Sequence, residues 1–406
     1  MNNLLVAQSG GPTAVINATL AGVIQGVRAS NKVDIVYGAK NGIEGVLKDN
    51  LIKLDDFVKD IVALDTLTYT PSSALGTCRY KLKDWREDEE PYRRISEAFY
   101  KYEISYFIYI GGNDSMDTVN KLSDYCKNKH HHFNIIGAPK TIDNDLNLTD
   151  HSPGFGSAAK YIATTMAELE SDTSSYDMPA VTIVEIMGRD AGWLTASSAL
   201  ARINGGAGPD LIYLCEKEFD YAGFLCNVRE KLEQKPNVLI AVSEGIKDGK
   251  GNYVSDQLSS GATDNFGHKY IAGAARTLEQ LVRRKIGCKV RSVELNLMQR
   301  ASAHIASETD VTEALLLGQK ALSCALNGEI GRMSAIKRLS NHPYRIEFIS
   351  VPVEEVANKE KKVPPSWISA DGHDVTKDMI DYLRPLIQGE TKIQYENGIP
   401  RQMKLF

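Results

Sequence analysis

Short, almost wholly apolar runs recur along the chain and are separated by longer stretches with helical periodicity. The runs occupy residues 4–8, 33–39, 104–110, 133–138, 180–187, 210–215, 238–242 and 290–295. Strands that are covered on both faces must be apolar nearly throughout, and most of the stretches between them are amphipathic over roughly 10 to 20 residues. This alternation predicts an α/β protein built from doubly wound, mainly parallel sheets.

Composition narrows the class of protein further. The chain has 406 residues, of which 43% are apolar and 24% are charged, and this profile excludes disorder, a collagen-like fibre and a coiled coil. One core stops growing near this length, so we expect two domains or one large unit with an appendage. The formal net charge of −5 provides no basic surface for nucleic acid or an anionic membrane. A small-molecule partner is therefore favoured.

The cysteines and the N-terminal residues indicate the compartment. The six cysteines are scattered, with no C-x-x-C pair: Cys78, Cys126, Cys215, Cys226, Cys288 and Cys324. This spacing predicts neither a zinc site nor a disulfide framework. The N-terminal residues lack the cationic and apolar regions of a signal peptide, and no stretch reaches the ~18 apolar residues of a membrane span. We expect a protein of the reducing cytoplasm.

Glycine-containing turns follow three of the expected strands. They lie at residues 9–13, 111–115 and 187–190. Ligands of an open α/β sheet bind at the carboxyl ends of its strands, so these turns are expected to line one cleft. Backbone N–H groups in the first turn, GGPTAVIN, are suited to a phosphate, although a plain strand-to-helix turn explains that segment equally well. Neither G-x-x-x-x-G-K-[ST] nor G-x-G-x-x-G occurs here, which weakens Walker-type and dinucleotide-type interpretations.

Two polar segments are candidates for chemistry. In PKTIDND, at residues 139–145, Asp143 is placed to take a proton from a substrate hydroxyl, and Asp145 to orient it or to help hold a metal. An Asx-turn with helix-capping acids is the alternative. In EIMGRDAGW, at 185–193, the guanidinium of Arg189 suits a phosphate ester, whereas a surface ion pair with Asp190 is the alternative.

Together these segments resemble the phosphofructokinase family, and especially its pyrophosphate-dependent members. The resemblance covers about the first 310 residues and follows the family's order: GGPTAVIN, GTCRY, GGNDS, PKTIDND, MGRDAGW, SEG and MQR. It implies two similar Rossmann-like domains with the active site in the cleft between them. It also implies reversible phosphoryl transfer to the 1-hydroxyl of fructose 6-phosphate, with Mg²⁺ bridging the donor.

The resemblance also implies roles for individual residues. The residues implied in catalysis are Asp143 as general base, Asp145, Lys140 and Asp114. Those implied to bind fructose 6-phosphate are Thr141, Met187, Gly188, Arg189, Glu244, Arg291 and Arg300. Those implied to bind pyrophosphate are Gly10, Gly11, Arg79, Gly112, Ser115 and Lys140. Those implied to hold the metal are Asn113 and Asp114.

The choice of phosphoryl donor rests on two side chains. ATP-dependent members have glycine where this chain has Asp114 and Lys140. An aspartate in that turn adds bulk and negative charge where the α-phosphate of ATP would lie, which disfavours a nucleotide. A lysine adds a cation that suits the small, highly charged diphosphate.

The chain departs from the family pattern at several positions. The usual metal-binding aspartate is Asn113, whose neutral carbonyl is a poorer Mg²⁺ ligand. Ala180 replaces an arginine, Leu297 replaces a histidine or tyrosine, and ASAHIAS follows MQR. The pocket for the 6-phosphate must therefore differ in detail, with His304 or Lys269 as possible recruits.

The expected domains are a donor domain at 1–154 plus about 299–335, a fructose 6-phosphate domain at 155–298, and a C-terminal appendage at 336–406. Within the last part, 333–338 and 344–352 look like strands. The family resemblance implies a homodimer or homotetramer. Two alternatives to the pyrophosphate-dependent enzyme stay open: an ATP-dependent 6-phosphofructokinase and a catalytically silent subunit that senses a sugar phosphate.

Overall fold

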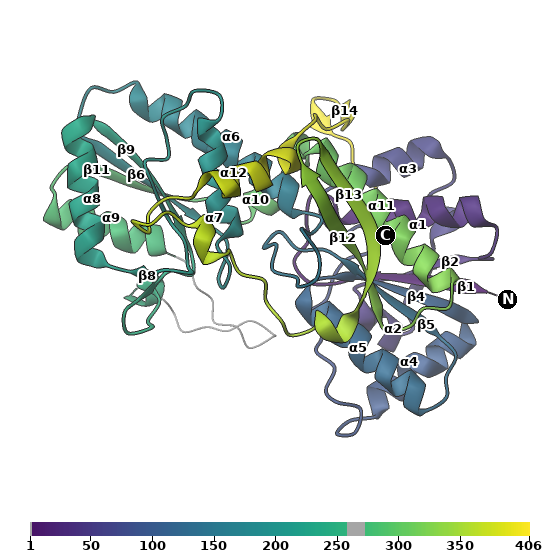
Figure 1. Ribbon diagram of the computed structural model, residues 1–406. Helices are drawn as coiled ribbons and strands as arrows, with labels where there is room; N and C mark the ends of the chain where they lie inside the picture. The colour runs from purple at the N-terminus through teal and green to yellow at the C-terminus, as the bar shows by residue number, and fades with distance from the viewer. Residues whose placement is uncertain (1, 258–272) are drawn as a thin grey trace. The chain divides into compact units, whose positions relative to one another are not determined.

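The computed structural model describes residues 2–257 and 273–406, which divide into two compact units (Figure 1). The first unit comprises Met1–Ser157, Arg300–Glu360 and Gln388–Phe406. The second unit comprises Ala158–Gln299 and Lys361–Ile387. Residues 336–406, expected as one appendage, are thus shared between the two units.

The first unit is built on a seven-stranded sheet with the order β13-β12-β5-β4-β1-β2-β3. Its strands are β1 (Asn3–Gln8), β2 (Val36–Ala39), β3 (Leu51–Lys53), β4 (Ile104–Gly111), β5 (Asn134–Pro139), β12 (Arg332–Asn341) and β13 (Tyr344–Pro352). The five strands from β12 to β2 pair in parallel, whereas β3 and β13 are antiparallel to their neighbours. The strands expected at 333–338 and 344–352 therefore form a hairpin that extends this sheet.

Helices cover both faces of the first sheet. They are α1 (Ile16–Ser30), α2 (Ile43–Leu47), α3 (Ile61–Thr68), α4 (Glu90–Lys101), α5 (Asn113–Asn128) and α11 (Glu308–Leu326). Successive residues of β1 point to opposite faces, so Leu5 packs in one core cluster and Leu4 in the other. Both are fully buried, which is why the strand is apolar from Leu4 to Ala7.

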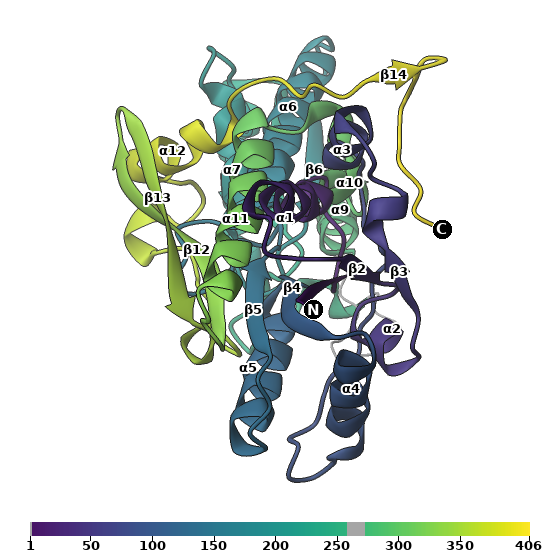
Figure 2. The ribbon, with the colours of Figure 1, turned by 90° about the vertical axis from the view of Figure 1, so that its right-hand side faces the viewer.

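Helices α1 and α11 cross at very short range (Figure 2). A Cβ atom at Gly22 would lie 1.9 Å from the carbonyl oxygen of Leu315, and one at Gly318 would lie 2.1 Å from that of Thr19. Both positions therefore require glycine, because any side chain would force the helices apart.

The second unit contains a four-stranded sheet with the order β11-β6-β9-β7, in which all neighbours are parallel. Its strands are β6 (Ala180–Ile186), β7 (Leu211–Tyr213), β9 (Asn237–Ser243) and β11 (Lys289–Glu294). Its helices are α6 (Phe155–Ser174, which begins in the first unit), α7 (Trp193–Ser197), α8 (Tyr221–Gln234), α9 (Ala274–Lys285) and α12 (Lys377–Leu383). The predicted α/β class with mainly parallel sheets is confirmed.

Several short elements complete the chain. The remaining helix is α10 (Met298–Ala301), within which the chain passes from the second unit to the first. The remaining strands are β8 (Glu218–Phe219), β10 (Lys247–Asp248), β14 (Tyr395–Glu396) and β15 (Ile399–Pro400). The 3₁₀ turns are η1 (Leu54–Asp56), η2 (Ser198–Arg202), η3 (Val254–Gln257), η4 (Ala303–Ile305), η5 (Val353–Glu355), η6 (Pro365–Trp367) and η7 (Arg384–Ile387). Within residues 2–257 and 273–406, none of the helices is both long and apolar enough to cross a membrane.

Candidate active site

In the first unit, the predicted donor segments follow adjacent strands at one edge of the sheet. Gln8 at the end of β1 lies opposite Ile110 of β4, and Gly111 lies opposite Pro139 at the end of β5. The Lys140 N–H donates to the Gly111 carbonyl at 3.0 Å. Because the three strands are parallel, the turns that follow them start side by side.

The first glycine turn is fastened to the segment that carries Arg79. The Thr77 hydroxyl donates to the Gly10 carbonyl at 2.6 Å, and the Gly10 N–H donates to the Cys78 carbonyl at 3.3 Å. Gly10 has φ +78°, and a Cβ there would lie 3.2 Å from the Lys140 amine. Glycine at this position therefore satisfies both the left-handed backbone and the close approach of a cation.

Lys140, which follows β5 at this edge of the sheet, is a buried charged group with a lowered pKa. Its side chain is buried, with the residue 3% exposed, and its Nζ donates to the Gly11 carbonyl at 2.7 Å. Burial lowers the pKa of Lys140 to about 8, partly offset by the charges of Asp143 and Asp145. Arg300 lowers the pKa further by repulsion. An amine that is buried beside other cations is poised to gain from a bound anion.

Arg300 and Arg79 are the other cations of this cluster. The Arg300 Nη1 lies 3.0 Å from where a Cβ on Gly11 would be. Burial lowers the pKa of Arg300, repulsion from Arg79 lowers it further, and the charge of Asp143 opposes both effects. Lys140, Arg79 and Arg300 thus gather around the Gly10–Gly11 turn with Asp143 close by.

The second glycine turn leads directly into α5. A Cβ on Gly111 would lie 2.0 Å from the Ser115 Oγ, so only glycine fits where the helix begins. Asp114 stands in the first turn of α5, and its Oδ1 lies 3.8 Å from the Lys81 Nζ. The first turn of a helix presents unpaired N–H groups, which suit a phosphate oxygen near Gly112 and Ser115.

Asn113 uses both ends of its side-chain amide within the protein. Its Nδ2 donates to the Lys359 carbonyl at 2.8 Å, and its Oδ1 accepts from the Asn358 N–H at 2.5 Å. The oxygen expected to meet the metal is therefore already an acceptor for the C-terminal part of the chain.

The loop that follows β5 carries the predicted base. The Thr141 Oγ1 accepts from the Asp143 N–H at 3.0 Å, and the Thr141 N–H donates to the Pro153 carbonyl at 3.2 Å. Asn144 is fully buried with φ +55°, while Asp143 and Asp145 on either side are half-buried. The loop thus holds two half-buried carboxylates on either side of a buried amide.

Farther along, this loop is anchored by a buried charge network centred on His151. The Nδ1 of His151 lies 2.8 Å from Asp150, and its Nε2 lies 2.5 Å from Glu313 of α11. Arg338 of β12 donates to Asp150 at 2.9 Å, and the Tyr344 hydroxyl donates to Glu313 at 2.6 Å. Burial opposes protonation of His151, but Glu313 and Asp150 raise its pKa to about 9.

This raised pKa predicts a pH dependence of stability. The His151 pKa is higher in the folded protein than in the unfolded chain, so its stabilisation is complete below about pH 6.5 and is lost as the pH rises through about 9. We expect the contribution of His151 to the free energy of unfolding to fall by about 3 kcal/mol across that range.

Urea unfolding at a series of pH values measures this effect. His151→Gln should flatten the pH dependence, whereas His132→Gln at an exposed position should keep it. An equally steep decline in wild type and His151→Gln would refute the assignment to His151.

The sequence interpretation did not single out the residues of α11 that hold this loop. Asp310 accepts from the Gly154 N–H at 3.0 Å and from the Ser157 N–H at 2.9 Å, and Glu313 binds His151. The sequence does contain a pattern that locates the start of α11, because Ser307-x-x-Asp310 is typical of a helix N-terminus and Ser307 caps α11. That pattern locates the helix but not the loop that packs on it.

In the second unit, the MGR and SEG segments meet at the ends of β6 and β9. The Ser243 hydroxyl donates to the Gly188 carbonyl at 2.6 Å, and the Gly188 N–H donates to Glu244 at 3.4 Å. Gly188 has φ +131°, and the Met187 N–H donates to the Gln299 side chain at 3.3 Å. Met187, Gly188 and Glu244 therefore lie together, as the candidate sugar-phosphate site requires.

The backbone of Arg189 lies against the segment that carries Glu244. A Cβ on Gly245 would lie 1.8 Å from the Arg189 carbonyl oxygen, so the two segments are in close contact. Across residues 2–257 and 273–406, the buried Nε of Arg189 has no hydrogen-bond acceptor. A ligand oxyanion would satisfy this donor.

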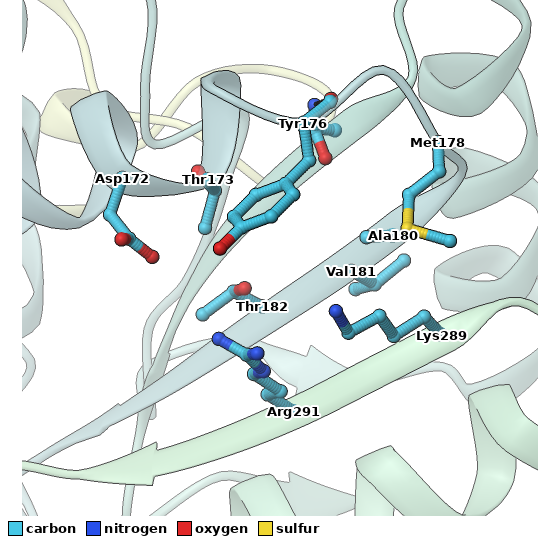
Figure 3. Close-up of a pocket in the computed structure, with 10 residues that line it drawn as sticks. Asp172, Thr173, Tyr176, Met178, Ala180, Val181, Thr182, Lys289 and Arg291 are labelled. Carbon is cyan, nitrogen blue, oxygen red and sulfur yellow. Dashed lines mark hydrogen bonds between the residues drawn. The ribbon is translucent and has the colours of Figure 1, made fainter.

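Arg291 lies elsewhere in the second unit, in a hollow beneath Tyr176 (Figure 3). It stands on β11 opposite Thr182 of β6, with Lys289 beside it. Thr182 precedes Met187 by five residues, about 16 Å along a strand. Within this unit, Arg291 is therefore remote from the MGR segment.

Arg291 and Arg300, both predicted to bind fructose 6-phosphate, belong to different units. Arg300 is part of the first unit and lies beside Gly11, whereas Arg291 is part of the second. His304 lies in η4 of the first unit, and Lys269 lies outside the described residues.

Mg²⁺ prefers oxygen ligands and commonly combines one or two carboxylates with substrate phosphates. In residues 2–257 and 273–406, there is no group of three or more histidine, cysteine, aspartate or glutamate side chains arranged to hold a metal. The half-buried carboxylates of Asp143 and Asp145, and that of Asp114, fit the looser type of site. Asn113 fits it less well, because its oxygen is neutral and already accepts one hydrogen bond.

Comparisons with known proteins agree with the resemblance seen in the motifs. A sequence model described as Phosphofructokinase matches residues 3–325. A relative from Halomonas elongata, named pyrophosphate--fructose 6-phosphate 1-phosphotransferase, is 42% identical and spans 100% of this chain and 96% of its own. A relative of the same name from Xanthomonas campestris is also 42% identical, over 99% of this chain and 96% of its own.

A solved structure supports the same placement. The pyrophosphate-dependent phosphofructokinase of Nitrosospira multiformis aligns with a TM-score of 0.90 at 37% identity, over 99% of this chain and 96% of that chain. Sequence and fold agree over nearly the whole length, and the resemblance drawn from the motifs is confirmed. The chain belongs to the phosphofructokinase family.

Proposed function

We propose that this protein transfers a phosphoryl group reversibly from pyrophosphate to the 1-hydroxyl of fructose 6-phosphate. The products are fructose 1,6-bisphosphate and phosphate. The observation that carries the proposal is the buried Lys140 amine, which lies with Arg79 and Arg300 around the Gly10–Gly11 turn. Relatives that share 42% identity over nearly their whole length are named for this reaction.

Pyrophosphate is the donor that this cation cluster suits best. The diphosphate concentrates a high charge in a small volume, so a buried amine and two guanidinium groups neutralise it effectively. In our proposal, N–H groups near Gly112 and Ser115 bind the same ligand at the start of α5. Asp114 in that turn disfavours the longer, negatively charged chain of a nucleoside triphosphate.

Asp143 is the proposed general base. It lies near the charges of Lys140 and Arg300, and a carboxylate there is proposed to accept the sugar's hydroxyl proton. Thr141 is proposed to contact the sugar, and Asp145 to support the base. When bound, Mg²⁺ would neutralise charge on the donor phosphates, with Asp143, Asp145 or Asp114 as the candidate ligands.

The acceptor site is proposed to lie in the second unit. Met187 and Gly188 meet Glu244 there, and the Arg189 guanidinium has a donor to offer to a phosphate. We accordingly propose the first unit as the donor domain and the second as the fructose 6-phosphate domain, in a cytoplasmic homodimer or homotetramer.

The donor assignment is tested by supplying pyrophosphate and ATP separately, with fructose 6-phosphate and Mg²⁺. We expect wild type to form fructose 1,6-bisphosphate with pyrophosphate only, and Asp114→Gly to gain measurable use of ATP. Turnover of wild-type protein with ATP would overturn the donor argument. Binding of fructose 6-phosphate without turnover on either donor would favour the silent subunit.

A further inference from the structure

We propose that Asn113 is a positioning residue that fastens residues 355–360 to the first turn of α5, and that it is not a magnesium ligand. Residues 355–360 are called the C-terminal strap below. The consequence for turnover rests on the proposed function, whereas the fastening itself does not.

The hydrogen bonds of Asn113 are directional in a way that only an amide satisfies. Its oxygen accepts from the Asn358 N–H at 2.5 Å, and its Nδ2 donates to the Lys359 carbonyl at 2.8 Å. One side chain thus pairs with a donor and an acceptor on consecutive residues of the strap. Asn358 itself has φ +59°, a left-handed conformation that turns its neighbours toward α5.

The strap is bound to α5 at a second point and to the loop that follows Asp145. The Asn358 Nδ2 donates to Asp117 of α5 at 3.0 Å. The Asn147 Nδ2 donates to the Glu355 carbonyl at 3.0 Å, and Glu360 forms a β-bridge with Leu146. The strap therefore joins the start of α5 to the end of the loop that carries Asp143 and Asp145.

Aspartate at position 113 would serve this connection badly. A carboxylate still accepts from the Asn358 N–H, but it cannot donate to the Lys359 carbonyl, and two oxygens would then face each other. If residue 113 were instead a metal ligand, Asn113→Asp would strengthen Mg²⁺ binding, because a carboxylate binds Mg²⁺ better than an amide oxygen does. Asn113→Asp therefore distinguishes a positioning residue, which it should impair, from a metal ligand, which it should improve.

The experiment compares Asn113→Asp with Asn128→Asp, the same chemical change at an exposed position near the other end of α5. Hydrogen exchange measured by mass spectrometry, without substrate, reports on the amides of the strap. For Asn113→Asp we expect exchange in the strap about tenfold faster than in wild type. Steady-state kinetics should show kcat lowered about tenfold, with no decrease in the Mg²⁺ concentration that gives half-maximal rate. Asn128→Asp should match wild type in both measurements.

Three results would overturn the proposal. Unchanged exchange with a lower Mg²⁺ requirement would make position 113 a metal-ligand site. If neither the exchange nor the Mg²⁺ requirement changes, Asn113 does not fasten the strap. If exchange in the strap is faster but turnover is normal, the fastening does not matter for the reaction. Asn113→Ala deletes both hydrogen bonds without adding charge, so exchange in the strap should be as fast as in Asn113→Asp. This variant replaces Asn113→Asp in the experiment if the aspartate variant does not fold. Absence of turnover in wild-type protein would refute the proposed function but leave the exchange test intact.

Discussion

Asp143→Asn is expected to lower kcat by about a thousand-fold with pyrophosphate and fructose 6-phosphate as substrates. The amide occupies the same volume and keeps one oxygen, but it cannot accept the proton of the sugar hydroxyl. Fructose 6-phosphate should still bind, because the proposed contacts to its phosphate come from other residues. Rates from initial-velocity assays and affinity from calorimetry separate the two effects.

The fold of this variant needs its own check, because Asp143 lies beside Lys140 and Arg300. Equal thermal unfolding midpoints for variant and wild type would exclude misfolding as the cause of lost turnover. A variant that keeps more than about a tenth of the wild-type kcat would show that Asp143 is not the base. Loss of sugar phosphate binding together with turnover would instead favour a sensing role.

Lys140→Met is expected to lower kcat/KM for pyrophosphate by about 100-fold, since a buried charge-assisted contact is worth about 1.5–3 kcal/mol. Methionine fills similar space, so the effect comes from the lost charge rather than from a cavity. The exposed Lys48 pairs with Glu44 on the surface, so Lys48→Met is the matched control and should behave as wild type.

The same lysine predicts a pH dependence of donor binding. Burial lowers the pKa of Lys140 to about 8, so the free protein loses this positive charge as the pH rises through that value. Because kcat/KM reports the free enzyme, the wild-type value should fall above about pH 8. Ionisation of pyrophosphate affects all variants alike, so the ratio of wild type to Lys140→Met isolates the lysine. A ratio that stays constant from pH 7 to about 9.5 would contradict this account.

Much of the fold could be predicted because strands and turns depend on residues that are close together in the sequence. The runs at 4–8 and 104–110 are apolar nearly throughout, and the structure buries most of their residues between parallel neighbours in the sheet. The turn at Gly111 could be located as well, since a side chain there would collide with Ser115, only four residues away. Strand ends were less certain: the run at 33–39 becomes a strand only at Val36–Ala39.

The sequence by itself thus determined the α/β class, the family and the segments that carry the chemistry. Periodicity, glycine turns and short motifs each depend on neighbouring residues. The tertiary structure alone decided which distant side chains meet. Asn113 is bonded to a residue 245 positions away, and Arg300 lies beside Gly11 while Arg291 lies in another unit. The pKa of Lys140 likewise depends on burial and on charges from separate segments. Such pairings arise from how strands and helices pack, and no local pattern records them.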